Sequence, residues 1–174
     1  KEQFEQVVLG DPNDEKTTLG PMARKDLRDQ LHQQVTDSVN AGATIITGGK
    51  VAEHTGFYYT PTLLENIKPG MPAYDDELFG PVASLIRAKD NAEAMQIAND
   101  SRYGLGGGIF SKDEQAAIEL AKLHFDTGMV NINGYGLAQP NLPFGGVKDS
   151  GYGREHGGFG LREFVNIKTI MVND

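Results

Sequence analysis

The stretch from Asp75 to Pro81 combines residue types that could bind a nucleotide. Three carboxylates are followed by Leu78, Phe79, a glycine and a proline, and a strand is expected next. One of these carboxylates, at the entrance of a strand, could accept hydrogen bonds from both hydroxyls of a ribose, while the neighbouring aromatic could flank a flat ring. The alternative interpretation is a solvated acidic turn with Phe79 in the core.

A second candidate is the glycine-rich stretch from Pro143 to Glu155. Five glycines fall between Gly145 and Gly157. The backbone must therefore adopt conformations closed to other residues or lie very close to something. Loops of this kind often face a ligand. The alternative is a tightly wound connection with a surface ion pair between Arg154 and Glu155.

The stretch from Tyr103 to Gly108 resembles a dinucleotide-binding loop only superficially. Such a loop follows a strand and opens a helix, whereas this one enters an expected strand. The glycines here are better explained by close packing of the backbone against its neighbours.

The sequence contains no cysteine and four histidines. It can therefore hold no disulfide, no thiolate metal site and no cysteine nucleophile. The histidines lack the spacing of metal ligands, and His32 is expected on the surface of a helix. We expect no metal site.

Composition narrows the class of protein. The chain has 174 residues, of which 39% are hydrophobic and 23% charged, with a net charge of −8. These values are typical of a globular chain that can bury a core. Apolar runs are far shorter than the roughly 20 residues of a membrane span, so we expect no membrane partner. Without a basic cluster we also expect no nucleic-acid partner. The absence of a signal peptide favours the cytoplasm.

Helical and strand patterns alternate along the chain. Apolar residues recur every fourth position at Leu27, Leu31, Val35 and Val39, which is typical of an amphipathic helix. Helices are expected at 22–41, 91–99 behind an Asp90 cap and 114–123 behind an Asp113 cap, with a helix ending near residue 9. Strands are expected at 43–47, 58–64, 82–88, 105–110, 128–133 and 164–172. This alternation predicts an α/β fold with a largely parallel sheet flanked by helices.

Six motifs in order resemble the carboxy-terminal part of an NAD(P)-dependent aldehyde dehydrogenase, over almost the whole chain. They are Leu19–Pro21, Gly56–Thr62, Glu77–Pro81, Asn99–Leu105, Gly128–Asn133 and Pro143–Glu155. The resemblance implies an incomplete catalytic domain over 1–160 and an oligomerisation tail over 161–174 that supplies a strand across a dimer.

The same resemblance implies roles for individual residues. Glu77 matches the carboxylate that holds the nicotinamide ribose, and Phe79 the residue beside the nicotinamide ring. The loop from Tyr135 to Asn141 matches the stretch that closes the aldehyde pocket. Its polar side chains Tyr135, Gln139 and Asn141, with Phe144 after them, are the candidate pocket residues.

The implied reaction begins with attack of a cysteine thiolate on the aldehyde, followed by hydride transfer to NAD or NADP and hydrolysis of the thioester by water that a glutamate activates. The cysteine, that glutamate and the nucleotide-binding domain are expected before Lys1, so we expect no catalytic residue in this chain and no activity from it alone. The expected partners are a small-molecule aldehyde, the chain's own N-terminal nucleotide-binding domain and further copies in a homodimer or tetramer.

Three stretches, 19–24, 132–135 and 144–148, resemble the bacterial succinate-semialdehyde branch of the family. A substrate with a distal carboxylate needs a cation or hydroxyl donors, and the loop from Tyr135 to Asn141 contains no arginine. Two alternatives stay open. One is a non-catalytic binding or oligomerisation module with the same fold, and the other is a coenzyme-A-acylating or semialdehyde-specific relative with different chemistry.

Overall fold

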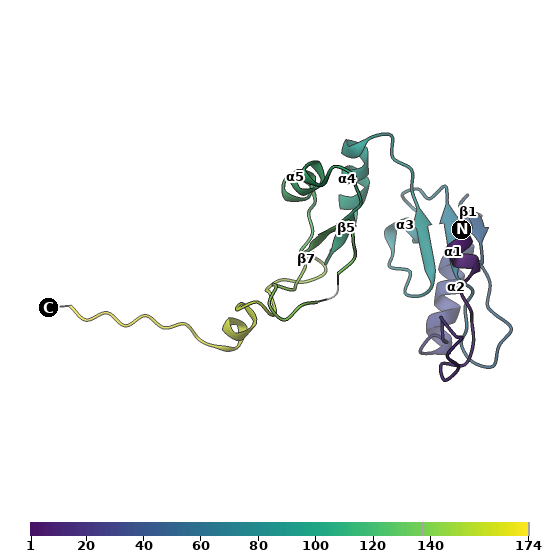
Figure 1. Cartoon of the computed structure of the whole chain (residues 1–174), viewed down its shortest axis with the longest axis horizontal. Coiled ribbons are helices and arrows are strands. Elements are labelled where there is room, and N and C mark those ends of the chain that lie inside the picture. Colours follow the sequence, from purple (N-terminus) through teal and green to yellow (C-terminus); the bar gives the residue numbers. More distant parts are fainter. Residues whose placement is uncertain (137, 174) are drawn as a thin grey trace. The chain divides into compact units, whose positions relative to one another are not determined.

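The computed structural model describes residues 1–136 and 138–173, which form two compact units, Lys1–Arg87 (unit 1) and Ala88–Asp174 (unit 2). The mixed α/β class is confirmed (Figure 1). The expected largely parallel sheet is not found in the described residues. Three small sheets are present instead, one of three strands in unit 1 and two of two strands in unit 2.

Unit 1 is built around one long helix and a three-stranded sheet. Its elements are α1 (Glu2–Glu5), α2 (Lys25–Asn40), β1 (Thr44–Thr47), β2 (Thr62–Glu65), α3 (Pro72–Asp75) and β3 (Val82–Leu85). The strand order is β1-β2-β3, with Ile45 opposite Leu64 in the antiparallel pair and Leu63 opposite Ala83 in the parallel pair.

The antiparallel pairing of β1 with β2 has a local cause. Gly48 and Gly49 follow β1 with φ of +78°, a conformation that glycine adopts without strain. The chain then folds back as a hairpin, marked by an antiparallel bridge between Val51 and Tyr59. No crossover helix intervenes, so β2 runs against β1.

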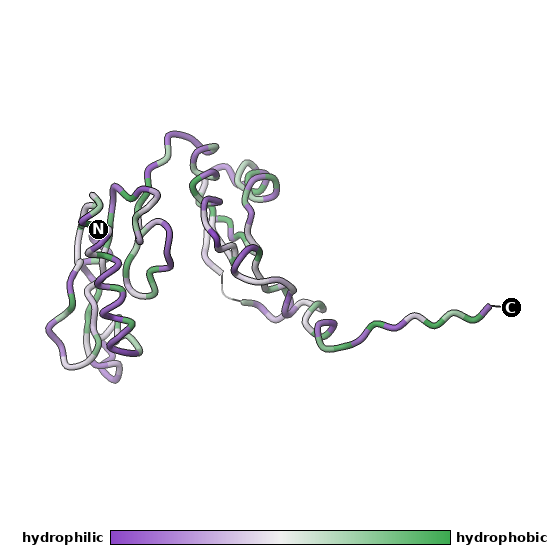
Figure 2. Tube along the Cα trace, turned by 180° about the vertical axis from the view of Figure 1, so that it is seen from behind, coloured by the Kyte–Doolittle hydropathy of each residue, from purple (hydrophilic) through white to green (hydrophobic). Residues whose placement is uncertain are grey.

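The core of unit 1 lies between α2 and the sheet. The four-residue stripe expected on this helix points inward: Leu31 and Val35 are buried with Leu64 of β2. The Ser38 hydroxyl donates to the Gln34 carbonyl at 2.8 Å and accepts from the amide of Ala73 at 2.9 Å, which ties α2 to α3. Hydrophobic and hydrophilic residues are interspersed along α2 (Figure 2). The helical period therefore predicted the buried face of this helix correctly.

Unit 2 consists of short elements joined by glycine-rich turns. They are α4 (Asn91–Asn99), β4 (Tyr103–Gly104), β5 (Gly107–Ile109), α5 (Glu114–His124), β6 (Val130–Ile132), β7 (Val147–Lys148) and the 3-10 helix η1 (Gly160–Phe164). β4 pairs antiparallel with β7, and β5 pairs parallel with β6.

Both predicted helix caps of unit 2 are confirmed. The Asp90 carboxylate accepts from the Glu93 amide at 2.8 Å, and the Asp113 carboxylate from the Ala116 amide at 2.9 Å. An aspartate in this position satisfies one of the backbone N–H groups that an α-helix leaves unpaired at its start.

Among the described residues, the strand expected at 164–172 is not formed. Residues 160–164 form η1, and 165–173 are extended, exposed and outside any strand of the described residues. An extended segment becomes a strand only when a neighbouring strand satisfies its N–H and C=O groups. The structure therefore gives an apolar extended tail without a strand partner.

Candidate active site

Phe79 projects from a short segment that is held on both sides. Leu78 packs against the core of unit 1, and a Cβ atom at Gly80 would overlap the side chain of Leu31. The Pro81 carbonyl accepts from the Thr62 amide at 2.8 Å, which ties the end of the segment to β2. Phe79 is 69% exposed, so the alternative of an aromatic tucked into the core is wrong.

Phe79 borders an apolar pocket of about 480 Å³ that lies wholly within unit 1. The pocket is lined by Leu19, Gly20, Pro21, Met22, Ala23, Leu27, Tyr59, Leu78, Phe79, Gly80 and Pro81. The motif at Leu19–Pro21 and the motif at Glu77–Pro81 thus meet at one place, although 55 or more residues separate them in sequence. A flat apolar ring could lie in this pocket against Phe79.

Glu77 stands beside the pocket rather than in its lining. Its backbone carbonyl accepts from the Gln34 side chain at 3.5 Å. Its carboxylate is exposed and makes no hydrogen bond or ion pair within the described part of the chain. Both of its oxygens are therefore available to a ligand.

Tyr59 and His32 form a polar pair at the pocket that the sequence did not indicate. Tyr59 is 1% exposed, and its hydroxyl lies 3.2 Å from Nδ1 of His32. Burial raises the pKa of Tyr59 to about 12, because the ionised phenolate would lose its hydration. His32 is half-buried against this ring, so its expected place on the surface is only partly right.

The candidate pocket residues of unit 2 do not gather in one place. Tyr135 is 92% exposed, and Gln139 and Asn141 are also exposed. Phe144 lines a separate pocket of about 280 Å³, to which none of these three side chains contributes. Leu137, which falls within the expected loop, lies outside the described residues.

Phe144 is fixed by its backbone and its ring. It pairs with Glu155 through two backbone hydrogen bonds of 2.9 and 2.7 Å, and its ring centroid lies 6.0 Å from that of His156. The imidazole Nδ1 of His156 is buried without a hydrogen-bond partner among the described residues. The glycine-rich stretch is therefore a hairpin that carries Phe144 on one side.

The alternative interpretation, in which Arg154 forms a surface ion pair with Glu155, is wrong. Its guanidinium donates to the carbonyls of Gly146 at 2.8 Å and Gly153 at 2.7 Å. No ion pair with Glu155 is present among the described residues. Arg154 closes the hairpin on itself.

Two further observations concern metals and membranes. Within residues 1–136 and 138–173, no three His, Cys, Asp or Glu side chains are grouped so that they could hold a metal ion. No helix in the same ranges has the length and apolar character needed to cross a membrane.

Comparison with known proteins gives a consistent result. Residues 1–170 match the model of the aldehyde dehydrogenase family. The chain is 49% identical over 164 residues to the Escherichia coli K12 protein named succinate semialdehyde dehydrogenase NAD(P)+ Sad, covering 94% of this chain and 35% of that protein. It is 46% identical over 171 residues to succinate-semialdehyde dehydrogenase NADP(+) 1 of Mycobacterium ulcerans Agy99, covering 98% and 37%.

Solved structures agree with this result. The structure of succinic semialdehyde dehydrogenase from Streptococcus pyogenes in complex with NADP+ superposes with a TM-score of 0.95 at 37% identity, over 99% of this chain and 38% of that one. Betaine aldehyde dehydrogenase from Staphylococcus aureus in complex with NAD+ superposes with a TM-score of 0.88 at 34% identity, over 94% and 33%. The chain thus spans a little over a third of the length of these relatives.

Proposed function

Because the chain belongs to the aldehyde dehydrogenase family, we propose that it supplies part of a site where an aldehyde is oxidised to the carboxylic acid with NAD or NADP. The observation that carries this proposal is the exposed Phe79 on the wall of an apolar pocket, next to the unpaired carboxylate of Glu77. An apolar wall and a free acceptor are what a nicotinamide riboside needs. Relatives named for NAD(P)+ and NADP+ support this choice of cofactor.

In this proposal Glu77 accepts the ribose hydroxyls and Phe79 limits the tilt of the nicotinamide ring. The cofactor, when bound, supplies the hydride acceptor. The two side chains act by orientation, because hydride transfer depends on the distance and angle between the reacting carbons. The pocket's apolar lining, including Met22 and Leu27, excludes water from one face.

The chain holds no thiolate of its own, since its sequence has no cysteine. We propose that the nucleophilic cysteine, and the glutamate that activates water, come from outside these 174 residues. No carboxylate described above takes the part of that base. The 174-residue chain alone should therefore not oxidise an aldehyde.

Succinate semialdehyde is the proposed aldehyde. The support is that relatives at 44 to 49% identity carry its name. The exposed polar groups of Tyr135, Gln139 and Asn141 could donate to the distal carboxylate. Nη1 of Arg154 already donates to two backbone carbonyls of the hairpin, so we do not assign the carboxylate to this side chain. A cation for the carboxylate would then come from outside this chain.

For assembly, we propose that residues 1–160 belong to the catalytic domain and 161–174 to the oligomerisation tail. The tail exposes Ile167, Ile170 and Val172 in an extended conformation, which suits strand pairing with a second copy in a homodimer or tetramer. An Ile167→Asp change should lower the oligomeric state, as measured by light scattering, whereas Lys168→Asp should leave it unchanged.

A cytoplasmic location stays a prediction.

The test replaces the matching third of the E. coli Sad protein with this chain and measures turnover. We expect oxidation of succinate semialdehyde at a kcat/KM at least tenfold above that of butanal, since a lost charged contact costs about 1.5–3 kcal/mol. Equal values for the two aldehydes would reject succinate semialdehyde. An inactive but folded chimera would favour the non-catalytic module.

Within that chimera, Glu77→Gln should raise the KM for the nicotinamide cofactor about 5- to 30-fold and leave the KM for the aldehyde nearly unchanged. The matched control is Glu53→Gln, an exposed carboxylate of the same unit that, unlike Glu77, has no pocket-lining residue next to it in sequence. A Glu77→Gln enzyme with unchanged cofactor KM would remove Glu77 from the proposed site.

A further inference from the structure

The glycine-rich hairpin of unit 2 cannot hold its shape by local preference. Within it, Gly151 and Gly153 have φ of +104° and +84°, and Gly157 and Gly158 just after it have φ of +54° and +83°. Glycine populates this region as readily as the ordinary one, so such residues leave many conformations open. The position of the hairpin must therefore be set by contacts with other segments.

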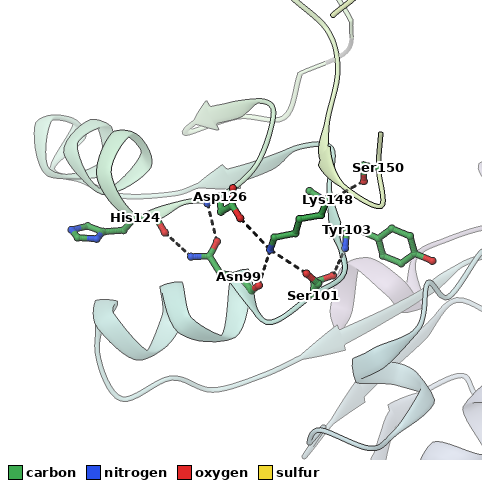
Figure 3. A network of polar contacts seen from close by, with 8 residues as sticks. Asn99, Ser101, Tyr103, His124, Asp126, Lys148 and Ser150 are labelled. Carbon is green, nitrogen blue, oxygen red and sulfur yellow. Dashed lines mark hydrogen bonds and ion pairs between the residues drawn. The ribbon is translucent and has the colours of Figure 1, made fainter. Parts of the chain in front are cut away.

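Lys148 makes the most extensive of these contacts. It lies in β7 with φ of +55°, a left-handed conformation that is uncommon for a residue with a side chain. Its ammonium donates to the carbonyl of Asn99 at 2.8 Å and to that of Ser101 at 3.1 Å, and it lies 3.6 Å from the carboxylate of Asp126 (Figure 3). The unusual backbone conformation is thus accompanied by three polar contacts at the end of the side chain.

The carbonyls that Lys148 binds belong to the end of a helix. Asn99 is the last residue of α4, where carbonyl groups lack partners within the helix and the dipole favours a cation. The last turn of α4 contains no basic residue of its own. Lys148 therefore supplies the missing positive charge from 49 residues further along the chain.

The side chain of Asn99 extends the same arrangement to α5. Its amide nitrogen donates to the His124 carbonyl at 2.6 Å, and its amide oxygen accepts from the Asp126 backbone at 2.9 Å (Figure 3). The ends of α4 and α5 and the strand β7 thus meet at one point. We call the contacts of the Lys148 ammonium with Asn99, Ser101 and Asp126 the Lys148 clasp.

The residues after Lys148 continue the attachment. The Asp149 amide donates to the Arg102 carbonyl at 2.9 Å, and the Ser150 hydroxyl accepts from the Gly104 amide at 3.0 Å. Three successive residues of the hairpin are thus fixed to the segment from Asn99 to Gly104, which connects α4 with β4. Phe144 lies four residues before Lys148, on the strand of the hairpin that pairs with Glu155.

We propose that Lys148 is a positioning residue for the aldehyde pocket: its clasp fixes the hairpin from Phe144 to Glu155 on the ends of α4 and α5, and so fixes the Phe144 ring. This rests on the proposed function, to which it adds that Phe144, one of the candidate pocket residues, borders the aldehyde. Lys148 itself touches neither substrate nor cofactor. Its effect on catalysis is transmitted through the backbone of the hairpin.

The first test is amide hydrogen exchange on the 174-residue chain, which needs no activity. In Lys148→Met, the amides of Phe144 and Glu155, which are hydrogen-bonded to each other's carbonyls, should exchange at least about tenfold faster. Lys148→Arg should keep most of the protection, because its guanidinium can still donate to both carbonyls. Lys122→Met, at an exposed ion pair with Glu119, is the control and should change neither amide.

Two outcomes of the exchange experiment would overturn the proposal. One is unchanged protection of Phe144 and Glu155 in Lys148→Met. The other is loss of protection throughout α4 and α5 as well, which would make Lys148 a residue of general stability rather than of position.

The second test uses the chimera with E. coli Sad. In Lys148→Met the KM for succinate semialdehyde should rise about tenfold while the KM for the cofactor stays constant. In Lys148→Arg the KM for succinate semialdehyde should stay close to that of the unsubstituted chimera. An equal rise in both KM values would contradict a role at the aldehyde pocket. If the unsubstituted chimera oxidises no aldehyde, the proposed function fails, and the exchange experiment still decides whether the clasp holds the hairpin.

Discussion

Each of the two units is stabilised internally, and the interactions that stabilise them differ. In unit 1, eight buried hydrophobic residues form one cluster between α2, β2 and α3. In the described residues of unit 2, Ala117 is the one hydrophobic side chain that is buried. Unit 2 is held instead by close approach of glycine backbones and by polar contacts such as the Lys148 clasp.

The difference bears on how each unit presents its candidate site residues. In unit 1, Phe79 is placed by side chains that fill space around it, Leu78 and Leu31 among them. Packing of this kind tolerates few conformations, because even a small change in side-chain volume disturbs the close-packed core. In unit 2, Phe144 is placed by hydrogen bonds to a backbone that glycines leave free to move. The position of Phe79 in unit 1 should therefore be sensitive to changes in the volume of the side chains around it. The position of Phe144 in unit 2 should be sensitive to added Cβ atoms and to lost charges.

The largest effect should come from a cavity in unit 1. Leu64 is 0% exposed at the centre of the cluster, so Leu64→Ala should lower the free energy of unfolding by about 2–5 kcal/mol. Urea denaturation, followed by hydrogen exchange of peptides from residues 31–73, measures the loss. The control is Leu123→Ala, at an exposed position of α5, which should cost less than about 0.5 kcal/mol. Equal costs at the two sites would show that unit 1 does not depend on this cluster.

The next largest effect should come from one added methyl group in unit 2. A Cβ atom at Gly128 would overlap the carbonyl oxygen of Gly145, which is backbone and cannot turn away. Gly128→Ala should therefore destabilise the hairpin by about 1–3 kcal/mol. Peptides spanning 144–150 should exchange faster.

Gly134→Ala is the matched control for this change. The nearest atom to a Cβ there is the Ile132 carbonyl oxygen at 4.0 Å, so the methyl group has room. We expect no faster exchange in this variant. If Gly128→Ala behaves like Gly134→Ala, close backbone contact does not hold unit 2 together.

The contrast also explains what the sequence could predict. The apolar period at Leu31 and Val35 and the aspartate caps at Asp90 and Asp113 are local signals, and the structure confirms them. The prediction of a largely parallel sheet was wrong for β1 and β2, because the direction of β2 depends on the turn at Gly48. The pattern of the strand residues carries no information about that turn.

Other features depend on partners far away in sequence. The motif at Glu77–Pro81 was recognisable, but it does not contain the core contacts of Leu78 and Gly80, which flank the exposed Phe79. Lys148 and Asn99 both lie in recognised motifs, but their contact could not be predicted, since residues 49 apart meet only through the fold. The terminal segment shows a strand pattern without a strand, because the pattern does not specify a partner.

The smallest effect concerns surface charge in unit 1. Arg24 binds the Asp26 carboxylate through two nitrogens, and this hydrogen bonding lowers the pKa of Asp26 to about 2. Because the folded-state pKa is below the ordinary value of 3.8, the pair's contribution is present above that value and is lost as the pH falls toward 2.

Both side chains are exposed, so solvent screens the pair and its effect on unfolding at pH 7 should be too small to shift the urea midpoint. A carboxyl titration by NMR should place Asp26 near 2 in the unsubstituted chain and nearer 3.8 in Arg24→Gln. Lys25→Gln, which removes a partner of Asp29 instead, should leave the Asp26 titration in place. A clear drop in the urea midpoint of Arg24→Gln would mean that surface charge, and not the Leu64 cluster alone, holds unit 1, and the contrast between the two units would narrow.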